Sequence, residues 1–374
     1  MGGSNRSKNG LLDLIRENPF DPPNPRSYYS MNMKKLTIYF CLLASVAMAQ
    51  KQAVQLTNNE AQKRVDVTVD GKPFTSYIYP GPDVLKKPVL YPIRTAGGNF
   101  ITRGWPMDPR PGERVDHPHH VGMWLNYGDV NGHDFWNNSN DVKGHGGPFG
   151  TIVHTGIKSL KSGKDVGELV VTADWLDKDG KPMLQETTTF VFRGTPKERI
   201  INRTTTLKAL GKDVTFKDNK EGMVAIRLAR QLEHPSNKPE VFTDASGVAT
   251  KVSQMDNTGV TGKYKSSEGV EGEKVWGTRA KWMNLIGVIN GENVSVALLD
   301  NPKNIGYPTY WHSRGYGLYA ANPLAPSVMS EGKDKPMNYV LPAGKSVTFR
   351  YEVLITTGSV SDDALSQKVN QFAN

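Results

Sequence analysis

A short histidine-rich segment carries the side chains best suited to chemistry in this sequence. His117, His119 and His120 fall within four positions and directly follow Asp116. Imidazole titrates near neutral pH, so such residues serve as general acids, general bases or metal ligands. Because Pro118 favours an extended residue before it, we expect His117 and His119 to point to one side and His120 to the other. The alternative is that these histidines only form hydrogen bonds that structure a loop.

The next run interleaves aromatic, amide and carboxylate side chains. Aromatic rings stack on sugar rings, and Asp and Asn hydrogen-bond hydroxyls, so this composition is typical of a cleft for a polar ring-shaped ligand. The predicted substrate-binding residues of this run are Trp124, Asn126, Asp129, Asn131, Asp134 and Trp136. Two alternatives stay open. One is an Asx-turn loop with buried aromatic residues, and the other is a calcium site that lacks the EF-hand spacing.

Two segments distant in sequence are expected to join the same cleft. Glu221 stands at the mouth of a predicted strand, where a carboxylate can act as a general base. A second segment places His312 and Arg314 between aromatic and glycine residues. We predict one catalytic cleft formed by His117, His119, His120, Glu221, His312 and Arg314, with Trp311 and Tyr316 as further substrate-binding residues.

Within that cleft we assign distinct roles. His119 or His120 is expected to transfer protons, and His312 with Arg314 to stabilise developing negative charge. The sequence defines no metal-ligand set, so no cofactor is assigned and a divalent metal on the histidines stays an alternative. Gly-x-Gly-x-x-Gly, P-loop, Gly-x-Ser-x-Gly and His-Glu-x-x-His motifs are missing. Their absence argues against nucleotide-dependent chemistry and standard serine or zinc hydrolysis.

Most of the remaining chain alternates between apolar and polar residues, which is the period of a half-buried β-strand. Such runs occur at 64–69, 74–79, 168–175, 187–192, 199–207, 223–228, 280–286, 294–299 and 347–355. Asp70-Gly71 and Asp179-Gly180 supply hairpin turns, and helical periodicity is convincing only at 362–372. We predict an all-β fold, a large antiparallel β-sandwich. It would form a single domain over residues 50–374, with a long polar loop excursion at 232–275.

The first 49 residues are predicted to lie outside this domain. Residues 1–32 are polar and are interpreted as a disordered leader or a mis-assigned start. Residues 33–49 have the basic, apolar and small-residue regions of a signal peptide, so we expect a periplasmic or secreted protein that begins at Gln50. A retained signal anchor is the alternative. No second apolar run follows, so we expect no membrane span after signal removal.

The composition limits both chemistry and partners. The single cysteine is Cys41, so residues 50–374 contain no disulfide and no thiolate site. The first 49 residues hold six lysines and arginines and three acidic residues, which leaves +6 of the +9 net charge for the rest. The basic residues are scattered, so we expect no nucleic-acid partner. The expected ligand is a carbohydrate or another small polar substrate.

The segments described above resemble a known family, DUF6807. The resemblance rests on residues 114–124 and 128–136, is supported by 90–93, 216–222 and 311–323, and extends over residues 60–357. The family is often labelled "methane oxygenase PmoA". Particulate methane monooxygenase is a membrane copper complex, so the label supplies no mechanism for this chain. The resemblance implies an exported β-sandwich protein, often from glycan-degrading bacteria, and by analogy a supersandwich like that of galactose mutarotases.

These observations together favour an exported carbohydrate-acting enzyme, a hydrolase, lyase or epimerase, that uses histidine and carboxylate acid–base chemistry. Two alternatives belong to other classes. A non-catalytic glycan-binding protein would present an aromatic platform without paired titrating groups. A His-ligated metal oxidoreductase would bring three ligands together around an open position.

Overall fold

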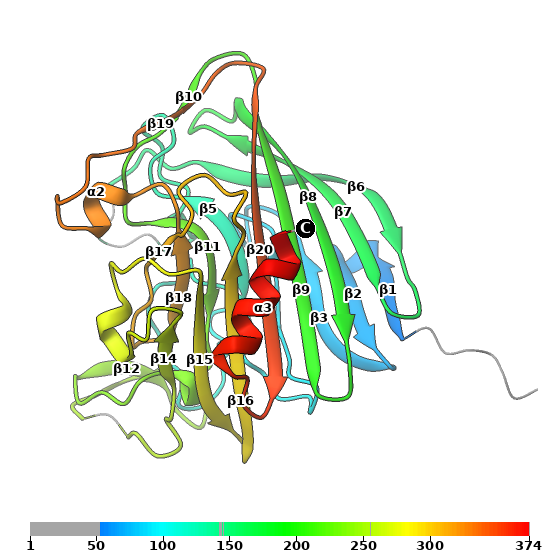
Figure 1. Cartoon of the computed structure of the whole chain (residues 1–374), viewed down its shortest axis with the longest axis vertical. Helices are drawn as coiled ribbons and strands as arrows, with labels where there is room; N and C mark the ends of the chain where they lie inside the picture. The colour runs from blue at the N-terminus through cyan, green and yellow to red at the C-terminus, as the bar shows by residue number, and fades with distance from the viewer. Residues whose placement is uncertain (1–52, 142–143, 145, 255, 374) are drawn as a thin grey trace, which may run out of the picture. The chain divides into compact units, whose positions relative to one another are not determined.

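Two eight-stranded antiparallel sheets make up most of the computed structural model, which describes residues 53–141, 144, 146–254 and 256–373 (Figure 1). The predicted leader and signal peptide lie outside the described residues. The first sheet has the order β1 (Val54–Asn59), β2 (Arg64–Val69), β3 (Lys72–Ile78), β4 (Val89–Leu90), β5 (Met123–Tyr127), β11 (Gly222–Arg227), β18 (Leu318–Asn322) and β17 (Tyr310–Trp311). The second sheet has the order β14 (Lys263–Ser266), β15 (Trp282–Ile289), β16 (Glu292–Asp300), β20 (Ser346–Thr357), β9 (Glu198–Ala209), β8 (Pro182–Gly194), β7 (Gly167–Leu176) and β6 (Thr151–Lys161).

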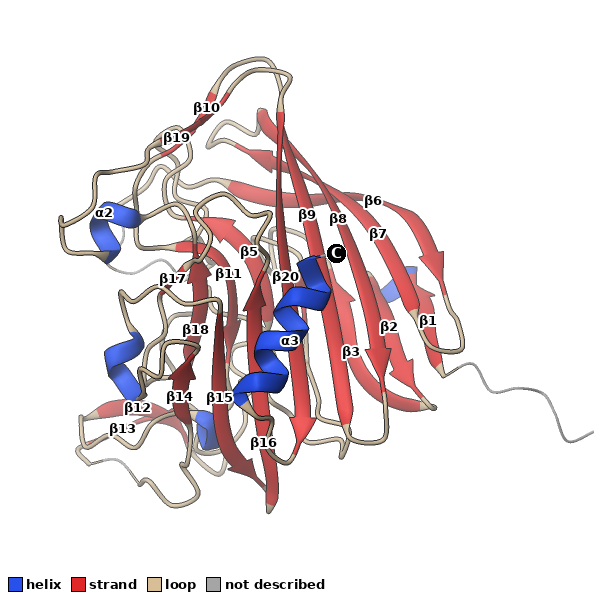
Figure 2. Ribbon diagram, viewed as in Figure 1, coloured by secondary structure: helices blue, strands red, loops and turns tan. Residues whose placement is uncertain are grey.

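Short elements complete the fold (Figure 2). Two small ladders pair β10 (Val214–Phe216) with β19 (Tyr339–Leu341), and β12 (Glu240–Thr243) with β13 (Ala249–Val252). The helical elements are η1 (Glu60–Gln62), η2 (Arg230–Leu232), η3 (Gly272–Val275), α2 (Pro326–Met329) and α3 (Asp362–Ala373). Helix α3 buries Leu365 and Val369 against Trp282 of β15. Among the described residues, no helix has the length and apolar character needed to cross a bilayer.

The hydrophobic core lies between the two sheets, because alternate side chains of each strand point inward. Phe74 of β3 meets Phe192 of β8 edge-on, with ring centroids 6.1 Å apart. Tyr77 of β3 meets Phe190 of β8 at 5.8 Å. The predicted all-β antiparallel sandwich is therefore confirmed.

Several local predictions can be compared with the structure. The predicted strand at 64–69 is β2, and Asp70-Gly71 forms the predicted hairpin, with positive φ angles of 50° and 74°. The C-terminal helix is present as α3. The prediction of a loop excursion over 232–275 is wrong, because this segment contains β12, β13, η3 and the edge strand β14. Its polar composition reflects strands that lie at an edge or in a surface hairpin rather than a lack of strands.

Three central strands of the first sheet, β5, β11 and β18, are buried along their whole lengths. One face of them packs into the core between the sheets. On the other face, Trp124 pairs with Ala225 across the strands, and Ala225 pairs with Ala320. The two small alanines leave space beside the Trp124 indole for the loops that cover this face. This covered outer face positions the site.

Candidate active site

A cavity of about 480 Å³ is lined by residues that flank both ends of the β5–β11 pair and the start of β18. All six predicted catalytic residues line it: His117, His119, His120, Glu221, His312 and Arg314. Trp136 and Tyr316, two of the predicted substrate-binding residues, also line it. Segments more than 190 residues apart in sequence thus meet at one cavity, because the strands they flank are neighbours in the first sheet.

The histidine segment is a tight turn, and the expectation of an extended segment is wrong. The His120 N–H donates to the His117 carbonyl at 2.9 Å, and His117 has a positive φ of 43°. Pro118 occupies the second position of this turn, where a fixed proline φ is favourable. The turn brings the His117 and His120 rings onto the same side, opposite to the alternation that an extended strand would give.

Four aromatic rings form a continuous stack at the base of the cavity. Tyr316 stacks on His117 with centroids 5.0 Å apart, and His117 stacks on His120 at 4.8 Å, both within 10° of parallel. His120 in turn stacks on Trp124 at 5.1 Å. The His117 ring is therefore held on both faces, so its orientation in the cavity is fixed by packing.

A buried arginine, Arg103, hydrogen-bonds the backbone carbonyls of this turn. Arg103 donates through one guanidinium nitrogen to the backbone carbonyl of Asp116 at 2.8 Å, and through the other to the carbonyls of His117 at 3.0 Å and His120 at 3.1 Å. Burial lowers the pKa of Arg103 to about 9, and the nearby Arg227 charge acts in the same direction. The guanidinium thus stays charged at neutral pH and fixes the backbone on which the histidines are mounted.

Asp116 links Arg103 to His117. Its Oδ1 accepts hydrogen bonds from Arg103 and from Arg227, the latter at 2.6 Å, and its Oδ2 lies 2.8 Å from His117 Nδ1. Burial alone would raise the pKa of Asp116, but Arg227, His117 and Arg103 outweigh it and hold the pKa well below its usual value. The carboxylate therefore accepts a hydrogen bond from His117 Nδ1–H, and in this tautomer Nε2 carries the free lone pair.

His120 has a different protonation pattern. Arg227 lies with Nη1 3.2 Å from His120 Nδ1, and because a guanidinium can only donate, Nδ1 accepts and the proton resides on Nε2. Burial, followed by the charges of the neighbouring histidines and of Arg227, holds the pKa of His120 well below its usual value. His120 is thus a neutral N–H donor, and its Nε2 has no hydrogen-bond partner among the described residues.

The opposite wall of the cavity holds a second imidazole–carboxylate pair. His312 Nδ1 lies 3.6 Å from Glu221 Oε2, and Lys220 pairs with Glu221 Oε1 at 2.9 Å. Burial lowers the pKa of His312 to about 4 although the Glu221 charge opposes it. Arg314 packs over the Trp276 ring at 4.5 Å, which holds a cation at the cavity wall.

The other predicted substrate-binding residues do not line this cavity. Trp124, Asn126 and Trp311 are fully buried, and the Asn126 amide and the Trp311 indole donate to backbone carbonyls of Phe135 and Ala280. The remaining polar side chains close loop turns. Asp129 accepts from Gly132 N–H, Asn131 bonds the backbone at 213 and 215, and Asp134 accepts from Trp136 and Asn137 N–H. This is the Asx-turn alternative, and these turn bonds occupy oxygens that a calcium ion would need.

Sequence reasoning missed three buried cations beneath the site: Arg103, Arg227 and Lys87. Arg227 is the last residue of the otherwise apolar strand β11. A charged residue in an apolar, buried strand indicates a buried ion pair. Lys87 is 2% exposed, and its ammonium donates to the His119 carbonyl at 2.7 Å. Burial lowers the pKa of Lys87 to about 7, whereas the Asp134 charge raises it. No pattern of spacing predicts these contacts, which depend on tertiary packing.

The geometry also bears on the metal alternative. Across the part of the chain that the structure describes, no group of three or more His, Cys, Asp or Glu side chains is arranged to hold a metal ion. Nitrogen lone pairs lie in the plane of the imidazole ring, and the parallel planes of His117 and His120 cannot both contain one ion. Their Nδ1 atoms are already engaged by Asp116 and Arg227.

A family model matches residues 64–370, which is most of the chain. The chain belongs to the DUF6807 family. This family is described as one of unknown function, so membership assigns no reaction. The resemblance seen in the histidine, aspartate and tryptophan segments is thereby confirmed. No curated protein matches the sequence significantly.

Solved structures show only distant likeness. The GH36 α-galactosidase AgaB from Geobacillus stearothermophilus is 10% identical, with 84% of this chain and 42% of that chain covered and a TM-score of 0.39. A putative aldose 1-epimerase from Escherichia coli K12 is 10% identical, with 82% and 99% covered and a TM-score of 0.32. The chain spans 42% of the length of the α-galactosidases that it matches. Similarity this low assigns no activity.

Proposed function

We propose that this protein is a carbohydrate-acting enzyme that works by general acid–base catalysis, with His117 as the residue that transfers the proton. One observation carries the proposal. His117 is oriented by Asp116 through Nδ1 and held between two rings, and it is 38% exposed at the cavity that the other candidate residues line. A base that is oriented by a carboxylate and open to the ligand is the arrangement that acid–base catalysis requires.

This assignment changes the roles expected from the sequence. His120 has its Nδ1 engaged by Arg227, its pKa depressed and its Nε2 buried, so it suits a role in holding the His117 ring rather than proton transfer. The carbonyl of His119 is held by Lys87, which fixes the turn. His312 and Arg314 remain the pair proposed to stabilise developing negative charge. An imidazole N–H and a guanidinium cation can both do so.

The groups around His117 favour one reaction class over another. Removal of a proton next to a carbonyl creates an enolate oxygen, which neutral N–H donors and cations stabilise. Arg314 and Lys220 provide cations at the cavity. Glycoside hydrolysis instead relies mainly on two carboxylates that flank the bond. Of the two carboxylates that line this cavity, Glu221 and Glu273, the first is already paired with Lys220 at 2.9 Å. We therefore favour a lyase or an epimerase over a hydrolase.

A sugar substrate follows from the other lining residues. Trp276 and Tyr316 offer aromatic surface, while Glu221, Glu273 and Asn137 offer hydrogen-bonding groups for hydroxyls. The proposed working location is the periplasm or the exterior, because residues 33–49 have the pattern of a signal peptide. N-terminal sequencing of the exported protein should then begin at or near Gln50.

Turnover assays on mono-, oligo- and oxidised sugars test the proposal. On any sugar that reacts, His117→Gln should lower turnover by about 10²- to 10⁴-fold, the usual effect of removing a general acid or base. The matched control is His154→Gln, which alters a half-buried histidine that hydrogen-bonds Tyr77 away from this cavity. Equal turnover in both variants would contradict the role of His117. Sugar binding without turnover across the panel would replace the enzyme with a glycan-binding protein.

A further inference from the structure

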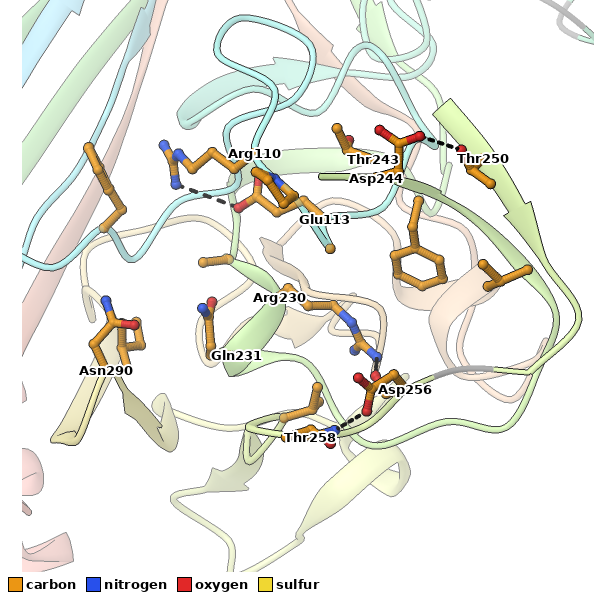
Figure 3. Close-up of a pocket in the computed structure, with 18 of the residues that line it drawn as sticks. Arg110, Glu113, Arg230, Gln231, Thr243, Asp244, Thr250, Asp256, Thr258 and Asn290 are labelled. Atoms are coloured by element: carbon orange, nitrogen blue, oxygen red, sulfur yellow. Dashed lines mark hydrogen bonds and ion pairs between the residues drawn. The ribbon is translucent and has the colours of Figure 1, made fainter. Parts of the chain in front are cut away.

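A second cavity, of about 490 Å³, shares no lining residue with the candidate active site (Figure 3). It is enclosed in part by the β12–β13 hairpin and by the turn at 256–260, which belong to the segment 232–275. Other walls come from residues 110–113, from η2 and from the end of β15. Its volume lies within the range of small-molecule sites.

The cavity has an apolar floor and two aromatic walls. Ala229, Val260 and Ile289 line it and are buried. Arg94 and Arg110 lie 3.7 and 3.9 Å from the centroid of the Phe100 ring. The Phe242 ring is likewise approached by Arg114 and Arg230, at 5.5 and 5.3 Å. Contacts with these cations hold both rings in place, so the walls are formed before any ligand binds.

Polar side chains also line this preformed space. Gln231, Thr250 and Thr258 contribute an amide and two hydroxyls to its lining. Figure 3 shows Arg110, Glu113 and Thr243 on one side of the cavity, with Gln231 and Thr258 on the other. Amide and hydroxyl groups both donate and accept hydrogen bonds, so these side chains can bond the hydroxyls of a ligand.

The charge of the lining indicates the class of ligand. Glu113, Asp244 and Asp256 give three acidic groups against the two cations Arg110 and Arg230. Arg230 also pairs with the buried Glu233 at 2.9 Å, and Arg110 lies 3.5 Å from Glu113. An anionic ligand would therefore meet no excess of positive charge. A neutral ligand that carries many hydroxyls can instead bond carboxylates, amides and hydroxyls while its apolar surface packs on Phe242 and on the apolar floor.

We infer that this cavity is a second carbohydrate site that binds a neutral mono- or disaccharide. The inference rests on the lining of this cavity and is independent of the reaction proposed above. The wall is also continuous with the active-site turn. The Gly112 N–H donates to the Thr243 carbonyl at 2.6 Å, and the Val115 N–H donates to the Val241 carbonyl at 2.8 Å. Residues 112–115 lead directly into Asp116 and His117. A bound sugar would brace the β12–β13 hairpin against that segment.

Isothermal titration calorimetry of the purified protein tests the inference, with glucose, galactose, maltose and cellobiose as probes and glucuronate as a charged counterpart. The double variant Gln231→Leu, Thr258→Val removes two polar groups from the lining without opening the apolar floor. It should weaken binding of a neutral sugar by about tenfold or more, from roughly 1 kcal/mol per lost hydrogen bond. His117→Gln should leave this binding within about twofold, because the His117 side chain does not line this cavity.

Each outcome of the titration has a defined meaning. Binding that is lost in the double variant and kept in His117→Gln supports the second site. Unchanged affinity in the double variant, or loss of binding in His117→Gln alone, overturns it. Absence of heat with every neutral sugar, in protein whose thermal transition shows that it is folded, also overturns it, as does tighter binding of glucuronate. Turnover by the double variant is measured separately and reports on the proposed enzyme rather than on this cavity.

Discussion

On the outer face of β5, β11 and β18, charged side chains are buried and paired, whereas on the outer face of β6 and β7 they stand in water. Arg227 of β11 is 0% exposed and contacts Asp116, which Arg103 also contacts. The comparable pair on the other sheet, Lys161 with Glu168, is 3.0 Å apart, with the lysine 71% exposed. Both regions contain ion pairs, but only the first is sealed by loops.

The difference shows how covering one face of a sheet holds buried charges in fixed contact. Removal of water lowers the local dielectric, so a carboxylate can hold two guanidinium groups and an imidazole in one geometry. The same burial keeps His120 and His312 neutral by lowering their pKa values. On an exposed face, water screens each charge and the same residue types have little effect on one another. The predictions below test this contrast.

The largest expected effect on stability comes from Asp116→Asn. The substitution leaves Arg103 and Arg227 buried without their shared carboxylate, so the free energy of unfolding should fall by about 3–5 kcal/mol, measured by urea unfolding. Glu168→Gln, in the exposed pair, should change it by less than about 1 kcal/mol. Similar losses in the two variants would show that the covered face is not electrostatically distinct.

The pH dependence of stability should also separate the two regions. The pKa of His312 is about 4 in the folded protein against 6.5 in the unfolded chain, so the unfolded state binds more protons between these values. The free energy of unfolding therefore rises between pH 4 and 6.5, by about 3 kcal/mol from this group at about 1.4 kcal/mol per pKa unit. His312→Gln should flatten that rise in urea titrations at pH 4.5 and 7. His133→Gln, on a loop that does not line the cavity, is the control, and an unaltered slope in His312→Gln would contradict the prediction.

The smallest effect concerns the ring stack. Burial raises the pKa of Tyr316 to about 12, despite the opposing Arg227 charge, so its hydroxyl stays protonated in any neutral assay. Tyr316→Phe keeps the ring on His117 and should change kcat/KM by less than about twofold, whereas Tyr316→Ala should lower it by about tenfold, the scale of one aromatic contact. A large loss in Tyr316→Phe would instead assign the hydroxyl a direct role on substrate.

Particular residues show how far the sequence predicts the fold and the site. The alternation at 64–69 with Asp70-Gly71 is sufficient for β2 and its hairpin, because both signals are local. The set of six cavity residues could also be assembled from the sequence, since glycine- and proline-rich strand ends concentrate such side chains. The turn at 117–120 could not, because extended and turned backbones both accept His-Pro-His-His. The clamp by Arg103, which contacts the carbonyls of His117 and His120, selects the turn.

The sequence by itself determined the strand-forming pattern, the antiparallel class and the identity of the titratable groups, because period and residue type act over a few neighbouring positions. Only the tertiary structure decided which partner each imidazole has. His117, His119 and His120 are chemically the same side chain, yet Asp116 accepts from one ring and Arg227 donates to another. Arg227 comes from β11, and Asp116 directly precedes the turn. The role of each histidine therefore depends on burial and on neighbours that only folding brings together.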